Sequence, residues 1–308
     1  MRAGLVTALA AACLVAGAPD RAGAGTPEVL GTRPTRVHGA PGPAAGDPPM
    51  TGLIWAPGID DGYVPQGVAW GNGAVYLSSY RSAAPEIDRG PCRIFKIDPR
   101  SGAPLGHFDL PETCGHLGGL AYVGKDTLVA SDTRRIYRID TARAFAPNSG
   151  AGAVTATVAL RGAVKGSFAD FDGRTLFVGA FEKGASKARG YFLPLTVFDT
   201  HDGKAIDARS AIRSIPLPRR AQGAAFDREG RLWISASSSR FGQLYRLADR
   251  TGRIASSHEM PIGMQDIAFD DEGRLWSVSE AGSLRWQGWA RTFPVIFRID
   301  PGKLGGRR

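Results

Sequence analysis

A strand–turn–strand pattern recurs five times along this chain and limits the fold more than any other feature. Successive copies start 52, 48, 56 and 43 residues apart. Each copy carries an alanine at the same position of its first strand: Ala69, Ala121, Ala169, Ala225 and Ala268. Repeats of this length are typical of propellers and solenoids. In a propeller the inner strands crowd around one axis, and this crowding explains a small side chain at that position.

Each repeat is predicted to form four antiparallel strands. A turn that contains glycine, as at Gly73 and Gly230, joins the first two strands, because glycine adopts a positive φ angle easily. The third strand alternates apolar and cationic residues, which is typical of a half-buried strand. We expect these third strands at residues 94–98, 136–140, 196–199, 244–247 and 296–300. A repeat of this kind is a propeller blade.

The two ends of the repeat array are predicted to close the ring. The fifth copy ends after its third strand, near residue 300, and no fourth strand follows it. An apolar strand at residues 52–57 precedes the first copy and is expected to complete the last blade, which protects an open sheet edge. The sequence thus predicts an all-β fold, a single β-propeller with five four-stranded antiparallel blades. Six blades are the alternative, if residues 25–60 or 182–191 contain a degenerate copy.

The N-terminus has the features of a secretory signal peptide over residues 1–24. An apolar run follows Arg2, is too short to span a bilayer, and ends before a small-x-small cleavage site. Residues 25–50 are rich in Gly, Pro and Ala and are predicted to form a flexible linker, so the propeller is expected over residues 51–308. We therefore expect a secreted protein whose mature form has no integral membrane segment. Lipid anchoring at Cys13 is not expected, because the apolar run continues past it.

The formal net charge is +9, and it falls to +8 when the predicted signal peptide is removed. A positive net charge indicates nucleic-acid binding when the cationic side chains cluster on one surface. Here they are scattered as single arginines, and the densest local group is Lys183, Lys187 and Arg189. We therefore expect no nucleic-acid partner. We expect a monomer that recognises a small molecule, a glycan or a protein.

Cys92 and Cys114 remain after removal of the signal peptide. In an exported protein such a pair is more often bridged than free. The closed loop of about 22 residues would then stabilise the fold by roughly 3 kcal/mol in the chain-entropy description. The alternative is two buried thiols. A zinc site is discounted, because His116 is the only histidine close by.

The residues that enter the inner strands are candidates for ligand binding, because inner-strand ends line the central channel of a propeller. These positions carry Gln66, His116, Lys165, Gln222 and Gln265. The glutamines either hydrogen-bond to one another, to channel water and to backbone, or form a ring of amides that holds a polar ligand or an ion. His116 is a candidate general base or ligand, because it lies at the channel entrance beside the predicted disulfide.

A second group of candidates lies at the ends of the second strands: Tyr80, Arg81, Asp132, Glu182, Ser238, Arg240 and Glu280. The carboxylates Asp132, Glu182 and Glu280 come from three blades and could converge on calcium or another divalent cation, which prefers oxygen ligands. Alternatively, each carboxylate pairs with an arginine. Arg81 is also a candidate ligand-binding residue, and the aromatic loop at residues 286–289 could stack on a sugar or another planar ligand.

The blade motif Pro-Gln-Gly-Val-Ala-Trp at residues 65–70 and its copy at residues 265–276 resemble those of NHL-repeat and senescence marker protein/gluconolactonase-like propellers. The resemblance covers roughly residues 52–300 and implies a propeller fold. In the gluconolactonase-like enzymes a glutamate at the first inner strand helps to bind a divalent metal. The matching residue here is Gln66, and a neutral ligand alone does not lower the pKa of a bound water.

Two functions remain open from the sequence. The first is a secreted binding or scaffold propeller that recognises a ligand at the mouth of the central channel. The second is a divalent-metal-dependent hydrolase of the lactonase type, in which Asp132, Glu182, Glu280 or His116 converge on the metal. The nucleophile-elbow, phosphate-loop and EF-hand patterns are absent from the sequence, so no such motif decides between them.

Overall fold

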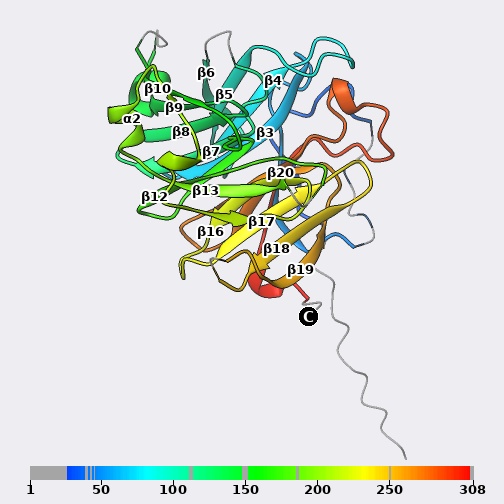
Figure 1. The fold of residues 1–308 in the computed structure, drawn as a ribbon. Helices are drawn as coiled ribbons and strands as arrows, with labels where there is room; N and C mark the ends of the chain where they lie inside the picture. The colour runs from blue at the N-terminus through cyan, green and yellow to red at the C-terminus, as the bar shows by residue number, and fades with distance from the viewer. Residues whose placement is uncertain are drawn as a thin grey trace, which may run out of the picture.

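The strands form five sheets that follow one another around a central axis, and each sheet is one blade of a propeller (Figure 1). The computed structural model describes residues 26–38, 41, 44, 46–110, 114–147, 152–184, 187–249 and 251–305. The five-bladed prediction is confirmed. The predicted signal peptide, with Cys13, lies outside the described residues.

The first four blades follow the chain in order. Blade 1 contains β3 (Tyr63–Gly71), β4 (Ala74–Arg81), β5 (Cys92–Ile97) and β6 (Pro104–Asp109). Blade 2 contains β7 (Gly119–Gly124), β8 (Thr127–Asp132), β9 (Arg135–Asp140) and β10 (Val154–Leu160), with β14 (Ala205–Ile206) at its edge. Blade 3 contains β11 (Phe168–Phe171), β12 (Thr175–Gly179), β13 (Arg189–Pro194) and β15 (Arg213–Pro216). Blade 4 contains β16 (Ala221–Phe226), β17 (Leu232–Ser237), β18 (Gly242–Leu247) and β19 (Ile254–Met260).

Blade 5 combines strands from both ends of the chain, as predicted. Its strands are β20 (Met264–Phe269), β21 (Leu275–Ser279), β22 (Val295–Ile299), β2 (Met50–Trp55) and β1 (Val29–Leu30). The N-terminal strand β2 pairs antiparallel with β22, with Leu53 opposite Phe297. This pairing closes the ring and covers the edge that the last repeat would otherwise expose.

Residues 25–50, predicted as a flexible linker, have contacts with blade 5 where they are described. Strand β1 runs parallel to β2, with Val29 opposite Leu53. The side chain of Val37 is buried. The carboxylate of Asp47 accepts hydrogen bonds of 2.6 and 3.0 Å from the guanidinium of Arg291. Part of this segment is therefore packed on the propeller.

The third strand of the third repeat was predicted at residues 196–199, and this is wrong. These residues belong to a short helix, α2 (Val197–Thr200), while β13 pairs with β12 as the third strand of the blade. Val197 and Phe198 are buried against blade 2. A short apolar run fits a helix as well as a strand, so the local pattern alone could not separate the two. The remaining helical segments are α1 (Thr141–Ala144), η2 (Ala208–Ser210), η3 (Leu284–Trp286) and η4 (Pro301–Lys303).

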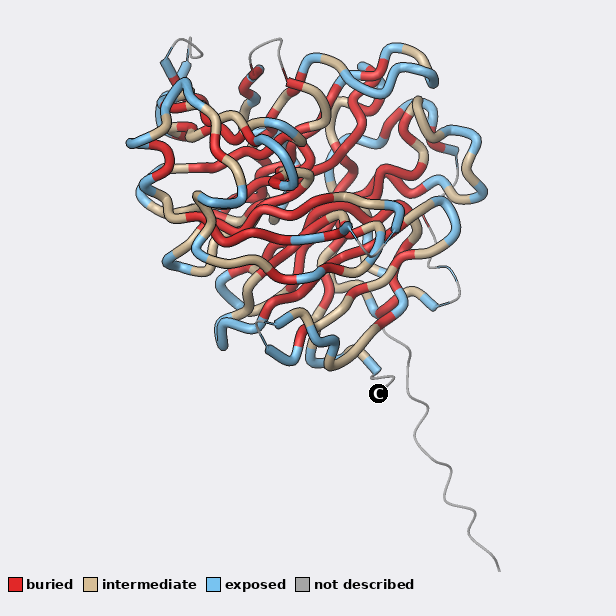
Figure 2. Tube along the Cα trace, in the orientation of Figure 1, coloured by how far each residue is buried: buried red, intermediate tan, exposed pale blue. Residues whose placement is uncertain are grey.

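The hydrophobic core is divided into five clusters, one between each pair of neighbouring blades. Figure 2 shows the buried segments along the strands and the exposed ones at the turns. Each blade therefore buries both of its faces. All five repeated alanines are buried and belong to these clusters.

The inner strands lie close together two residues before the repeated alanine, where a Cβ added at Gly67, Gly119 or Gly223 would lie within 3.0 Å of the neighbouring inner strand. Four repeats carry a small residue there, Gly67, Gly119, Ser167 or Gly223, and the fifth carries Asp266. The Asp266 side chain is fully buried and accepts backbone N–H groups of blades 1, 2 and 4. The axis is thus filled by one carboxylate and four small residues.

We predict that Gly119→Ala destabilises the propeller by about 2–3 kcal/mol, because overpacking of a filled site costs that much. A Cβ atom at this position would overlap the backbone of Phe168 and Ala169 in the next blade. Gly184→Ala is the control, since nothing lies within 4 Å of its added Cβ. Urea unfolding measures both variants, and equal unfolding free energies would contradict this account of the axis.

Candidate functional site

A cavity of about 530 Å³ opens where the inner strands begin and the second strands end. We call it the mouth pocket. All five blades contribute to its wall. In blade order, the main wall residues are Gln66, Tyr80, His116, Thr133, Lys165, Phe181, Lys183, Arg220, Gln222, Ser237, Gln265, Glu280, Arg285, Trp286 and Trp289.

Most of the predicted site residues lie on this wall. The five residues predicted at the inner-strand entries all line the mouth pocket: Gln66, His116, Lys165, Gln222 and Gln265. Glu280 lines it as well. Glu182 reaches it indirectly, through an ion pair with Lys165. Asp132 and Arg81 lie outside the wall, and the Nε atom of Arg81 donates to the carbonyl of Asp61 instead.

The glutamines at the pocket do not bond to one another in the described part of the chain. The Nε2 group of Gln66 donates to the carbonyl of Pro65 at 2.9 Å and to Oε2 of Glu280 at 3.0 Å. The Nε2 group of Gln265 donates to the carbonyl of Gly263 at 3.2 Å. Backbone and carboxylate contacts thus fix the amides of two glutamines, while Gln222 also borders the cavity.

Glu280 is the carboxyl group on the pocket wall, and it is only 7% exposed. Its Oε2 atom accepts hydrogen bonds from Gln66 and, at 2.7 Å, from Nε1 of Trp286. Burial raises the pKa of Glu280 to about 7, against the lowering effect of these two bonds and of the Arg285 charge. The group can therefore gain or lose a proton near neutral pH.

The blade 3 side of the pocket is built on an ion pair. The ammonium group of Lys165 contacts a carboxylate oxygen of Glu182, and both side chains are about a quarter exposed. The carbonyl of Glu182 accepts the backbone N–H of Arg220 at 2.7 Å. Arg220 has a φ angle of 57°, a left-handed conformation that is unusual for a residue other than glycine. This bond helps to hold Arg220 at the entry to β16, on the pocket wall.

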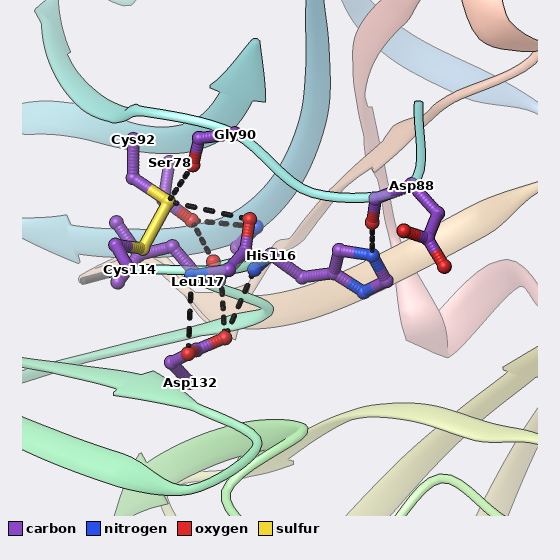
Figure 3. The surroundings of a disulfide bond; sticks show 10 residues. Ser78, Asp88, Gly90, Cys92, Cys114, His116, Leu117 and Asp132 are labelled. Atoms are coloured by element: carbon purple, nitrogen blue, oxygen red, sulfur yellow. Dashed lines mark hydrogen bonds between the residues drawn. A yellow bond between two sulfur atoms is a disulfide. The ribbon is translucent and has the colours of Figure 1, made fainter. Parts of the chain in front are cut away.

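A disulfide fixes the loop that carries His116, and the predicted Cys92–Cys114 pairing is confirmed (Figure 3). The carboxylate of Asp132 accepts the backbone N–H groups of Gly115, His116 and Leu117, the last at 3.3 Å. The His116 ring points away from the sulfur atoms and contacts the carbonyl of Asp88. It also stacks on Tyr80, with ring centroids 4.7 Å apart.

The structure does not bring the three predicted metal ligands together. Asp132 caps the His116 loop, Glu182 pairs with Lys165, and Glu280 bonds to Gln66 and Trp286. Among the described residues, no group of three or more His, Cys, Asp and Glu side chains is placed to hold a metal ion. The predicted calcium site therefore does not fit these side chains. The alternative pairing of each carboxylate with an arginine is not observed in these contacts either.

Three cationic wall residues, Lys183, Arg220 and Arg285, were not among the predicted site candidates. Arg220 directly precedes the fourth inner strand, and Arg285 directly precedes Trp286. The available signal for Arg220 was its position two residues before Gln222, which was chosen as the entry residue of the fourth inner strand. Arg285 had no such signal, since its loop is not part of the repeat.

The comparisons with known proteins support the fold alone. No protein-family model matches the chain, and no curated protein matches it. Among solved structures it is similar to Myxococcus xanthus glutaminyl cyclase, with 12% identity and a TM-score of 0.54 over 80% of this chain and 93% of that one. A Streptomyces coelicolor aldose sugar dehydrogenase has 15% identity and a TM-score of 0.45 over 76% of this chain and 93% of the other.

The resemblance to NHL-repeat and gluconolactonase-like propellers therefore stays a prediction at the level of the family. The propeller fold that it implied is present. The helices in the described ranges are all too short or too polar to cross a membrane.

We predict that replacing Cys92 and Cys114 together by serine lowers the free energy of unfolding by roughly 3 kcal/mol. The disulfide closes a loop between residues 22 positions apart, so its loss gives the unfolded chain more freedom. Urea unfolding of the wild type and the double variant, both without reductant, measures the change. An unchanged midpoint would show that the bridge does not stabilise the fold.

We predict that Glu280→Gln gains stability relative to the wild type as pH rises from about 4.5 to 7. The raised pKa means that protonated Glu280 stabilises the wild type below this window, and this contribution is lost as pH rises through about 7. The difference between variant and wild type should shift by about 3 kcal/mol between pH 4 and pH 8.

Urea unfolding at the two pH values measures this shift. Glu272→Gln is the control, because the side chain of Glu272 is on the same blade and 69% exposed. A shift of equal size in both variants would contradict the assignment to the buried carboxyl.

Proposed function

We propose that this protein is a secreted binding propeller that takes up a small anionic molecule in the mouth pocket. The observation that carries the proposal is the charge of the wall. Four cationic residues line the cavity, namely Lys165, Lys183, Arg220 and Arg285, against the single carboxyl group of Glu280. In the part of the chain that the structure describes, only Lys165 among the four forms an ion pair. A cavity of this charge attracts anions and concentrates them at its entrance.

Aromatic side chains supply the apolar part of the same wall. Tyr80, Phe181, Trp286 and Trp289 border the cavity, and the two tryptophan rings have centroids 4.8 Å apart. Such rings bury a large apolar area and stack on planar groups. A ligand with a planar or ring-shaped body and an anionic group therefore matches both parts of the wall. The cavity volume lies in the usual range for small-molecule sites.

Export to an oxidising compartment is part of the proposal. The disulfide supports it, because such bonds persist outside the reducing cytosol. The signal-peptide pattern at residues 1–24 also supports it.

Hydrolysis of a lactone is the second candidate function, and Glu280 is the observation that favours it. A carboxyl with a pKa of about 7 is suited to general acid–base catalysis. Glu280 would take a proton from water while the water oxygen attacks the carbonyl carbon, and would return that proton to the leaving oxygen. Titration of released acid from a panel of lactones at pH 7, with Glu280→Gln as the inactive variant, tests this reaction.

We predict that Lys183→Met and Arg220→Met each weaken the binding of benzenesulfonate about fivefold, which corresponds to about 1 kcal/mol. Each change removes one positive charge from the wall and keeps a side chain of similar length. Isothermal titration calorimetry at low ionic strength gives the dissociation constants, because salt screens such attraction.

Lys187→Met and Arg219→Met are the matched controls. Both residues are exposed and lie close in sequence to their partners, but outside the pocket wall. Equal losses in all four variants would indicate a general charge effect. Absence of saturable binding of both benzenesulfonate and benzoate to the wild type would refute the proposed function.

A further inference from the structure

Only one of the two carboxyl oxygens of Glu280 accepts hydrogen bonds from the described residues. Both of its hydrogen bonds, from Gln66 and Trp286, end on Oε2. Oε1 takes no hydrogen bond from the residues that the structure describes. The two donors therefore fix the orientation of the carboxyl group and leave one oxygen available on the pocket wall.

The guanidinium of Arg285, on the same pocket wall, has N–H donors that lack hydrogen-bond acceptors. Its Nε and Nη1 atoms are buried, and neither has a hydrogen-bond partner among the described residues. The guanidinium lies over the ring of Trp286, with Cζ 4.6 Å from the ring centroid. Buried donors of a charged group without an acceptor are costly, so an oxyanion at this place would be strongly favoured. The fork of a guanidinium binds a planar carboxylate through two parallel hydrogen bonds.

We propose that the mouth pocket binds a carboxylate, held between the guanidinium of Arg285 and the protonated carboxyl group of Glu280. The inference rests on the proposed function, that the pocket takes up an anion, and names the chemical class of that anion. A protonated carboxyl donates one O–H bond to the ligand, whereas an ionised one repels it. Uptake of the ligand is then linked to the protonation of Glu280.

The linkage predicts that binding weakens as pH rises through about 7, where Glu280 loses its proton. Other charged groups face the same space. Lys165, Lys183 and Arg220 are the other basic side chains on the wall, and burial raises the pKa of Tyr80. His116, stacked on Tyr80, is the histidine on the same wall, so the test must separate its contribution from that of Glu280.

The experiment compares three probes of the same size by isothermal titration calorimetry at pH 6 and pH 8. Benzoate carries a planar carboxylate, benzenesulfonate a tetrahedral anion, and benzamide no charge. We expect benzoate to bind about tenfold more weakly at pH 8, because the protonated fraction of Glu280 falls by that factor. Benzamide should not bind detectably.

Four variants assign the effect. In Glu280→Gln the amide imitates the protonated carboxyl, so benzoate should bind equally well at both pH values. Arg285→Met should lose benzoate binding at both, and Arg285→Lys should recover only part of it, since lysine lacks the planar fork. His116→Gln should keep the ratio between the two pH values. Circular dichroism confirms that each variant is folded.

Three outcomes would overturn the inference. Binding of benzenesulfonate without binding of benzoate would exclude a carboxylate as the ligand class, but it would leave the proposed uptake of an anion intact. A pH dependence that persists in Glu280→Gln and disappears in His116→Gln would assign the proton to the histidine. Failure of both anions to bind would refute the proposed function itself.

Discussion

The carboxylate of Asp266 holds inner strands of several blades at fixed distances around the axis. It accepts backbone N–H groups of Val68, Leu120 and Ala224, from blades 1, 2 and 4, at 3.0 to 3.4 Å. Burial raises the pKa of Asp266 well above its ordinary value, while these bonds act in the opposite direction. Removal of the side chain would leave buried N–H groups without acceptors, each at a cost of about 1–3 kcal/mol. The geometry of the ring therefore depends on this one side chain.

The position of the mouth pocket follows from the same packing. Residues that directly precede the inner strands, such as Gln66, Gln222 and Gln265, must meet at one end of the axis when the strands are held together there. The wall is therefore assembled from residues far apart in the sequence but equivalent in the repeat. Part of its specific character comes from residues outside the repeat, since Arg285 and Trp286 belong to the connection between β21 and β22.

The sequence could predict what the repeat determines. The blade number, the closure by residues 52–57 and the wall residues at the inner-strand entries followed from aligning the copies. It could not predict individual partners, because Gln66 and Glu280 are 214 positions apart and only the folded ring shows their contact. Asp132 was predicted to face a metal, but its carboxylate accepts backbone N–H groups of the loop at residues 115–117. The sequence does not show this use of the carboxylate. The role of Asp266 was not predicted, although the four equivalent repeat positions carry Gly67, Gly119, Ser167 and Gly223.

The bond between Gln66 and Glu280 joins the first blade to the last, so the candidate site spans the place where the ring closes. On its outer side the same closure is made by β2 pairing with β22. Glu280 owes its raised pKa to burial, and that burial requires blades 1 and 5 to be in contact. A chain with an open ring would hydrate this carboxyl and return its pKa toward the ordinary range. The proton affinity of the site is therefore a property of the closed propeller, although the titrating group belongs to a single residue.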